Sequence, residues 1–273
     1  MLALNNRMQW EKLDSPFGNS GELPELIEKL AKTFDLDLLV EITTEYITHQ
    51  MSLYEVTFAV FPYLIKIGEN TEDKIFQLET LLSTTVMLSE YGGDNELDAI
   101  FSNSKCSPEQ IIEIKFSFKE ACKKLKHLVS YLEGDILQRD ESERKYFLLA
   151  LAVANEIYSV SSILWRYHEN EEYGCGCPNC DETFILWNEE DKLVLYKEDP
   201  VFTKDQEQFA VHPSSLMPSS FSKKVSPDKN YAWLSHYIDS LGITSLKTTI
   251  NYLFGTAQCP YCEAEFEIFE NIQ

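Results

Sequence analysis

The sequence predicts a mainly α-helical protein that ends in a small α+β module, and three observations lead to this fold class. Between residues 22 and 168, apolar side chains recur at intervals of three and four, which is typical of amphipathic helices. After Tyr173, short aromatic and β-branched runs replace that pattern. Two Cys-Pro-x-Cys turns, which begin at Cys177 and Cys259, lie in this second region. We therefore expect a helical domain over residues 1–170 and a second module over residues 171–273.

The expected helices of the first domain follow one another with short breaks. The first follows Ser20, whose hydroxyl can cap a helix, and has Pro24 in its first turn, where the missing donor costs nothing. Pro62 lies inside the third helix and should kink or restart it. Further breaks are expected at Gly92-Gly93 and at Gly134. After the first helix, the others are expected over residues 36–49, 52–67, 72–90, 108–132 and 140–168.

Amphipathic helices of this length cannot bury their apolar stripes alone. They must stack on one another, either as helix pairs in a solenoid or as a bundle. No strict repeat period is visible in the sequence, so the periodicity leaves both arrangements open.

The second module begins with an expected hairpin, in which residues 183–187 and 193–196 form the strands around a polar turn. Residues 198–228 contain four prolines and several serines and are expected to be irregular. Two helices should follow, over residues 229–241 and 244–254, with Gly242 between them.

The two Cys-Pro-x-Cys turns carry the clearest chemical signal in the chain. A gap of two residues lets both thiolates of a turn reach one metal ion, so the two turns supply four sulfur ligands. Zinc binds four such sulfurs tetrahedrally at about 2.3 Å, and a closed shell of four cysteines leaves no position for water or substrate. We therefore predict one structural zinc ion. Its ligands are Cys177, Cys180, Cys259 and Cys262.

The turns are separated by 78 residues, whereas about 15 to 20 are common in simple zinc sites. Both turns nevertheless begin the same sequence phrase. In each, Cys-Pro-x-Cys is followed by three residues, a phenylalanine (Phe184 or Phe266), one further residue and an aliphatic residue. Two equivalent turns that face one ion explain this duplication. The sequence thus predicts a zinc-ribbon-like module in which each turn precedes a strand and the long insertion is looped out.

Other interpretations of the cysteines remain open. The four thiols could be reduced and metal-free, or one pair could be a redox Cys-x-x-Cys, although the βαβ context of such motifs is missing. Cys175, two residues before the first turn, is either a bystander or replaces one ligand. Cys106 and Cys122 stand apart from the turns and are expected to be small core residues.

Composition restricts the partners. The formal net charge of −22 repels phosphates, so nucleic acid is not an expected partner, and a basic protein is the natural complement. Solubility alone is the alternative explanation of the charge. No apolar run approaches the roughly 18 residues that span a bilayer, and no signal peptide is apparent, so we expect a cytoplasmic protein. Catalytic motifs are absent, and the five histidines lack a metal spacing.

The first third of the chain resembles the HEAT-like helical immunity proteins of bacterial polymorphic toxin systems. The matching features are Trp10 and Leu13, the turn at residues 17–20, Leu23-Pro24, and the phrases at residues 47–50 and 54–65. Met51 departs from the family, in which a glycine usually follows His-Gln. The resemblance covers about residues 10–66 closely and the helices to about 168 loosely, and it implies a HEAT-like solenoid.

The resemblance also implies a function. We expect a non-catalytic protein-binding protein, an immunity protein that neutralises a cognate toxin through an acidic surface. Two other classes remain as alternatives: a zinc-ribbon protein associated with nucleic acid, and an enzyme whose site is assembled from dispersed residues.

Overall fold

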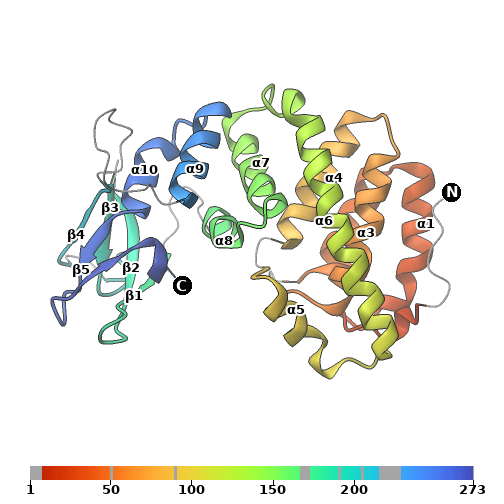
Figure 1. Cartoon of the computed structure of the whole chain (residues 1–273), viewed down its shortest axis with the longest axis horizontal. Coiled ribbons are helices and arrows are strands. Elements are labelled where there is room, and N and C mark those ends of the chain that lie inside the picture. Colours follow the sequence, from red (N-terminus) through yellow and green to blue (C-terminus); the bar gives the residue numbers. More distant parts are fainter. Residues whose placement is uncertain are drawn as a thin grey trace. The chain divides into compact units, whose positions relative to one another are not determined.

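A computed structural model of the chain describes residues 8–49, 52–88, 91–166, 173–189, 192–203, 206–214 and 229–272 (Figure 1). It divides into two compact units, residues 1–162 and 163–273. The division falls inside the helix Tyr158–Arg166, a few residues before the boundary predicted between 170 and 171. The two units are described separately below.

The first unit is built from helices, which confirms the prediction of a mainly α-helical protein. Short turns of 3-10 helix, η1 (Trp10–Lys12), η2 (Ser20–Glu22) and η4 (Phe101–Asn103), join longer elements. In chain order these are α1 (Leu23–Thr33), α2 (Leu36–Glu41), the π-helical η3 (Ile42–Ile47), α3 (Glu55–Glu69), α4 (Lys74–Leu88), α5 (Asp94–Ile100), α6 (Pro108–Ile136), α7 (Glu141–Ala154) and α8 (Tyr158–Arg166).

The core of this unit forms where the long helix α6 packs against α3 and α4 (Figure 1). Phe118 of α6 is buried, and its ring lies edge-on to those of Phe58, Phe61 and Tyr91 at centroid distances of 5.0, 5.3 and 5.4 Å. Such edge-to-face aromatic pairs add to the free energy gained from burying their area. The stripes predicted from the sequence therefore meet one another in a shared core.

Several local predictions need correction. Ser20 does not cap α1, because its hydroxyl is buried and donates to the carbonyl of Leu13 at 2.9 Å, whereas Pro24 does lie in the first turn. Gly134 lies inside α6 rather than ending it. The helix α5 was not predicted. The third helix does not restart at Pro62, since α3 runs through it without a break and contacts α4 and α6.

The helix predicted over residues 140–168 is also wrong, because the structure has two helices, α7 and α8, with a break at Asn155. Glu156 follows in a left-handed conformation with φ 61°. The amide of Ile157 then donates to the carbonyl of Ala152 at 2.9 Å, and that of Glu156 to Val153 at 3.0 Å. This pair of bonds is the Schellman motif, which ends α7.

The second unit is an antiparallel sheet of six strands in sequence order, with two helices inserted before the fifth strand. The predicted hairpin and both predicted helices are confirmed, whereas β4 arises inside the segment expected to be irregular, of which residues 204–205 and 215–228 lie outside the described residues. The elements are β1 (Tyr173–Gly176), β2 (Thr183–Glu189), β3 (Lys192–Tyr196), β4 (Phe209–His212), α9 (Lys229–Ser240), α10 (Leu246–Leu253), β5 (Thr256–Gln258), β6 (Glu265–Glu267) and the 3-10 turn η5 (Phe269–Asn271).

The sheet curls so that its two ends approach each other. A bridge pairs Cys175 of β1 with Ile272, which follows β6. The inserted helices α9 and α10 pack on each other, and α10 also packs on β3. Across both units, none of the helices that the structure describes has the length and apolarity to cross a membrane.

Candidate metal centre

The four cysteines predicted as metal ligands lie in two short turns of the second unit. Cys177 and Cys180 occupy the turn between β1 and β2, and Cys259 and Cys262 occupy the turn between β5 and β6. Each turn therefore immediately precedes a strand, as the duplicated phrase indicates. The 78 intervening residues contain β2, β3, β4, α9, α10 and β5, and the curl of the sheet brings its two ends, and with them the two turns, together despite the long insertion.

The two turns have the same backbone geometry. In the first, the amide of Cys177 donates to the carbonyl of Glu182 at 2.8 Å, and the amide of Asp181 donates to Cys177 at 3.0 Å. In the second, the corresponding bonds run from Cys259 to Ala264 and from Glu263 to Cys259, both at 2.9 Å. The repeated sequence phrase is thus a repeated structure.

The left-handed residue also recurs. Asp181 and Glu263 occupy the same place in their turns, with φ 58° and 61°. Non-glycine residues adopt positive φ uncommonly, and aspartate does so more often than most. Its recurrence at equivalent positions indicates that the turn itself requires this conformation.

The phenylalanines of the two phrases hold the turns in register. Phe184 and Phe266 are both buried, and their rings stack at a centroid distance of 6.3 Å and an interplanar angle of 19°. Tyr261, at the tip of the second turn, stacks on Phe184 at 5.9 Å. The aliphatic residues that end the phrases, Leu186 and Ile268, are completely buried. A small apolar core formed by these residues therefore supports both turns.

The sulfur atoms of the four cysteines fit a tetrahedral metal ion. The Sγ atoms of Cys177 and Cys262 are 3.7 Å apart, as are those of Cys180 and Cys259, and all four lie within 4.8 Å of one another. A regular tetrahedron with metal–sulfur bonds of about 2.3 Å has edges of about 3.8 Å. These separations are much longer than the roughly 2.05 Å of a disulfide bond, and all four thiols are free.

Hydrogen bonds to sulfur favour the thiolate form at this site. The backbone of Ala264, together with the side-chain amide of Asn179 at 3.3 Å, lowers the pKa of Cys262 to about 6. A backbone hydrogen bond from Glu182 lowers the pKa of Cys180, but burial and the three neighbouring thiols outweigh it and raise that pKa to about 12. Four sulfurs so close together cannot all ionise without a cation between them, and a bound divalent cation supplies that charge.

The other cysteines lie outside this group. Cys175 is completely buried in β1 opposite Phe184, and burial raises its pKa to about 12. It is not one of the residues that share the sulfur cluster. Cys122 lies within α6, as predicted, and Cys106 is buried. The structure thus separates four clustered thiols from three that are not.

The structure also shows an acidic cluster that the sequence reasoning missed. The hydroxyl of Tyr46 in η3 donates to the carboxylate of Glu22 at 2.8 Å. This bond, burial and the nearby charges of Glu22, Glu41 and Glu45 raise the pKa of Tyr46 to about 12. We call these three exposed carboxylates the Tyr46 cluster. No ion pair joins them to a lysine or arginine anywhere in the described ranges.

A sequence signal for this cluster exists, because Glu41 and Glu45 are four residues apart and must share one helical face. In so acidic a chain that spacing occurs too often to stand out. The exposed side chain of Val40, 52% accessible, lies next to Glu41 in the sequence.

Comparison with known proteins adds no relative. No protein-family model matches the chain, and neither does any curated protein or solved structure.

Proposed function

We propose that Cys177, Cys180, Cys259 and Cys262 hold one structural zinc ion in a zinc-ribbon-like module. The separations between the sulfur atoms support this, because they fit the edges of a tetrahedron of zinc–sulfur bonds. The ion would cross-link turns that are far apart in the sequence, and its binding free energy would contribute to folding. Because four sulfurs fill the tetrahedral shell, the metal has no position for substrate.

Metal analysis of the purified full-length chain tests the zinc proposal. We expect about one zinc per chain, and thiols that react slowly until a chelator removes the metal. Replacement of Cys180 by serine should abolish the metal content. The Cys122→Ser variant, which changes a thiol outside the cluster, should keep it. A metal-free protein whose clustered thiols titrate freely under native conditions would contradict the proposal.

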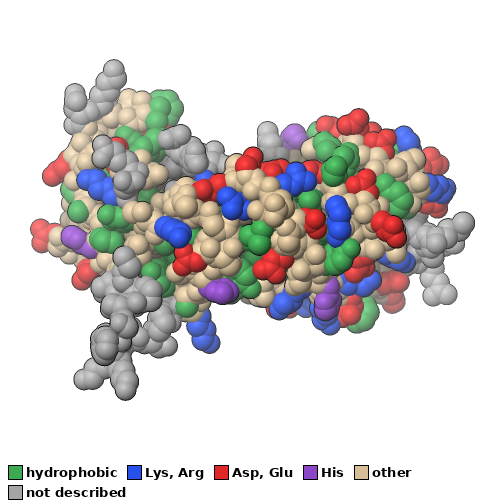
Figure 2. Space-filling view, turned by 90° about the horizontal axis from the view of Figure 1, so that it is seen from above, with side chains coloured by type: hydrophobic (Ala, Val, Ile, Leu, Met, Phe, Trp, Pro, Cys, Tyr) green, Lys and Arg blue, Asp and Glu red, His purple; other side chains and the backbone are tan. Residues whose placement is uncertain are grey.

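We further propose that the protein is a non-catalytic, cytoplasmic immunity protein with a HEAT-like helical unit, which binds a basic toxin and neutralises it. The observation that carries this proposal is the Tyr46 cluster, three exposed carboxylates without cationic partners among the described residues. The cluster lies within residues 10–66, where the chain resembles immunity proteins. On the face shown in Figure 2, acidic and basic side chains are interspersed, so a local cluster is a better candidate than a uniformly acidic face.

The other two function classes have weaker support. A nucleic-acid-binding zinc ribbon would need a basic surface beside its turns. Lys197 does lie over the Tyr261 ring, 4.7 Å from its centroid, but four exposed carboxylates outnumber it there: Asp181, Glu182, Glu263 and Glu265. An enzyme with a dispersed site would need convergent ionisable groups. In the part of the chain that the structure describes, the four cysteines are the one group with metal-ligand geometry, and the histidines stay outside it; His168 is not described.

Co-expression tests the immunity proposal. The chain should restore growth of bacteria that express the toxin encoded by the neighbouring gene, and a Glu41→Lys/Glu45→Lys variant should protect less well because it reverses the charge that attracts the toxin. The matched control, Glu267→Lys/Glu270→Lys, makes the same change in charge at exposed positions of the second unit. Equal protection by both variants would exclude the Tyr46 cluster, and no protection by the wild type would contradict the immunity role.

A further inference from the structure

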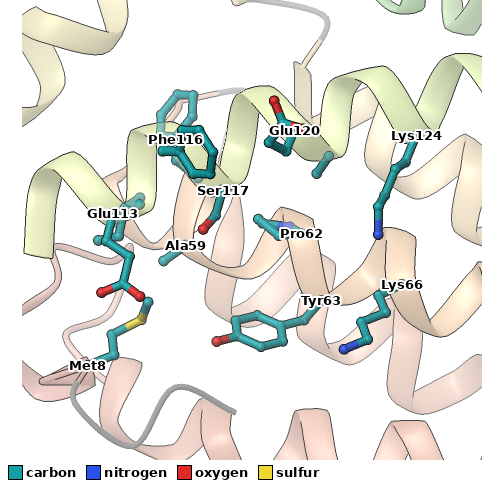
Figure 3. Close-up of a pocket in the computed structure, with 13 residues that line it drawn as sticks. Met8, Ala59, Pro62, Tyr63, Lys66, Glu113, Phe116, Ser117, Glu120 and Lys124 are labelled. Carbon is teal, nitrogen blue, oxygen red and sulfur yellow. The ribbon is translucent and has the colours of Figure 1, made fainter. Parts of the chain in front are cut away.

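A groove runs between α3 and α6 on the first unit (Figure 3). Its volume is about 250 Å³. Ala59, Pro62 and Tyr63 of α3 form one wall, and Phe116 and Ser117 of α6 form the other. Glu113 and Lys124 of α6 lie at opposite ends. The 11-residue step from Glu113 to Lys124 corresponds to about 16 Å along a helix axis, so the groove has the length of a peptide segment rather than of a compact small molecule.

One end of the groove carries two cationic side chains. Lys66 from α3 and Lys124 from α6 both lie there, whereas the carboxylate of Glu113 lies at the other end beside Met8 (Figure 3). Lys66 is half-buried, and among the described residues no ion pair or hydrogen bond is found for its ammonium group. Lys124 has an ion pair with Glu69 at 3.5 Å, with half of the lysine exposed. Such exposed pairs are weak, so Lys124 can exchange this partner for another carboxylate.

The middle of the groove is apolar and open to solvent at its rim. Phe116 is 67% exposed, and Ile112, four residues earlier on the same face of α6, is 68% exposed. Phe116 lines the groove, and Ile112 extends the exposed apolar surface by one turn along α6. Surfaces of this kind mark interaction sites more often than scattered apolar residues do.

We propose that this groove docks a segment of the protein partner in which an apolar side chain is followed by a carboxylate. The apolar side chain packs between Tyr63 and Phe116, and the carboxylate pairs with Lys66 and Lys124. Charge complementarity selects this occupant: Glu113 and Glu120 also line the groove, but Glu120 is paired with Lys123 and Glu113 lies at the other end, so Lys66 and Lys124 set the charge at one end. The contact in the groove fixes the position and orientation of the bound partner, while the acidic Tyr46 cluster attracts the partner over longer distances. This inference rests on the proposed function in one respect: the docked segment belongs to the protein partner that the chain is proposed to bind.

A peptide selection tests the groove without the partner. A phage-displayed library of random peptides of about 12 residues, long enough to span the groove, is selected on the full-length chain. We expect the enriched peptides to share an apolar residue followed by Asp or Glu. Binding should fall by at least about tenfold for Lys66→Gln/Lys124→Gln and for Phe116→Ala, because each change removes one half of the contact.

The control Lys32→Gln/Lys247→Gln removes two lysines elsewhere and should leave peptide binding unchanged. Circular dichroism establishes that every variant is folded. Peptides that bind the Lys66/Lys124 variant as tightly as the wild type would overturn the proposal, and so would a selection that yields no binder dependent on these lysines.

Co-expression with the toxin separates the groove proposal from the immunity proposal. If the groove variants protect as well as the wild type, the groove proposal fails and the immunity role stands; if peptides bind in the groove but no protection occurs, the immunity role alone fails.

Discussion

Gly255 lies at a place in the second unit that has no room for a side chain. It lies between α10 and β5, and a Cβ atom placed there would be 2.1 Å from the carbonyl oxygen of His212 in β4. The neighbouring backbone also depends on this approach, since the amide of Ile268 donates to the carbonyl of Gly255 at 3.0 Å. The close contact ties β4, β5 and the end of β6 together.

We predict that Gly255→Ala lowers the free energy of unfolding of the second unit by about 1–3 kcal/mol or more, because the methyl group forces β4 and β5 apart. Gly134→Ala is the matched control. Gly134 lies in α6 with nothing within 4 Å of its ideal Cβ, so alanine there should stabilise the helix by about 0.5–1 kcal/mol. Denaturant unfolding followed by circular dichroism measures the free energy of unfolding of both variants. An unchanged stability of Gly255→Ala would show that β4 and β5 can move apart without cost.

These residues also show what the sequence can reveal. The four clustered cysteines could be predicted because zinc chemistry dictates both their type and their local spacing. The constraint on Gly255 could not, because it comes from a carbonyl 43 residues earlier that only the folded sheet brings near. The Tyr46 cluster lies between these cases, since its spacing is visible but its lack of cationic partners is a property of the folded surface.

Helix ends illustrate the same limit at the level of elements. Both α7 and α9 end in a Schellman motif, with Glu156 and Gly242 as the left-handed residues at φ 61° and 63°. The break at Gly242 could be predicted because glycine adopts positive φ without steric cost. The break at Glu156 could not, because glutamate carries no such signal and the apolar periodicity continues across it. Tertiary packing of α7 on α6 and α4 decides where that helix ends.

The proline in α3 gives a prediction for an element. Pro62→Ala should raise the free energy of unfolding of the first unit by about 1–3 kcal/mol, because it restores the donor to the carbonyl of Phe58 in a continuous helix. Pro24→Ala is the control, since in the first turn of α1 the proline breaks no helical bond and its loss should change stability little. Thermal unfolding compares the two. A lower stability of the Pro62→Ala protein would mean that losing the packing of the proline ring costs more free energy than the restored hydrogen bond contributes.

The turn between β5 and β6 gives the second element-scale prediction. If the four cysteines hold zinc as proposed, Cys259→Ser should abolish zinc binding and unfold the second unit, while α1 to α7 keep most of the helical circular dichroism signal. Cys175→Ala changes a buried thiol outside the sulfur cluster and should retain the metal, with a moderate loss of stability from the cavity. Simultaneous loss of all helicity in Cys259→Ser would mean that the two units fold as one.

At the scale of the whole molecule, charge and chemistry are divided between the units. The first unit contains both the Tyr46 cluster and the α3/α6 groove, and the second contains the four clustered cysteines of the candidate metal centre. A mainly helical architecture could be predicted from apolar periodicity, which is a local property of the chain. How those helices stack could not, because the sequence has no strict repeat and packing depends on contacts such as that of Gly68 with Thr80, where a Cβ would lie 3.1 Å from the threonine methyl.

The net charge of −22 leads to a prediction about the kinetics of binding. If the chain neutralises a basic toxin, the association rate constant should fall as salt is raised, because the screening length shortens to about 8 Å at physiological ionic strength. The dissociation rate constant should change much less, since it depends on short-range contacts such as those proposed in the groove. Stopped-flow measurements over a range of salt concentrations separate the two constants. The Glu41→Lys/Glu45→Lys variant should weaken the salt dependence of association, whereas Phe116→Ala should act mainly on dissociation. Single-stranded or duplex nucleic acid should not compete, because phosphates are repelled by the same charge. Tight nucleic-acid binding in the absence of a protein partner would instead favour the zinc-ribbon alternative.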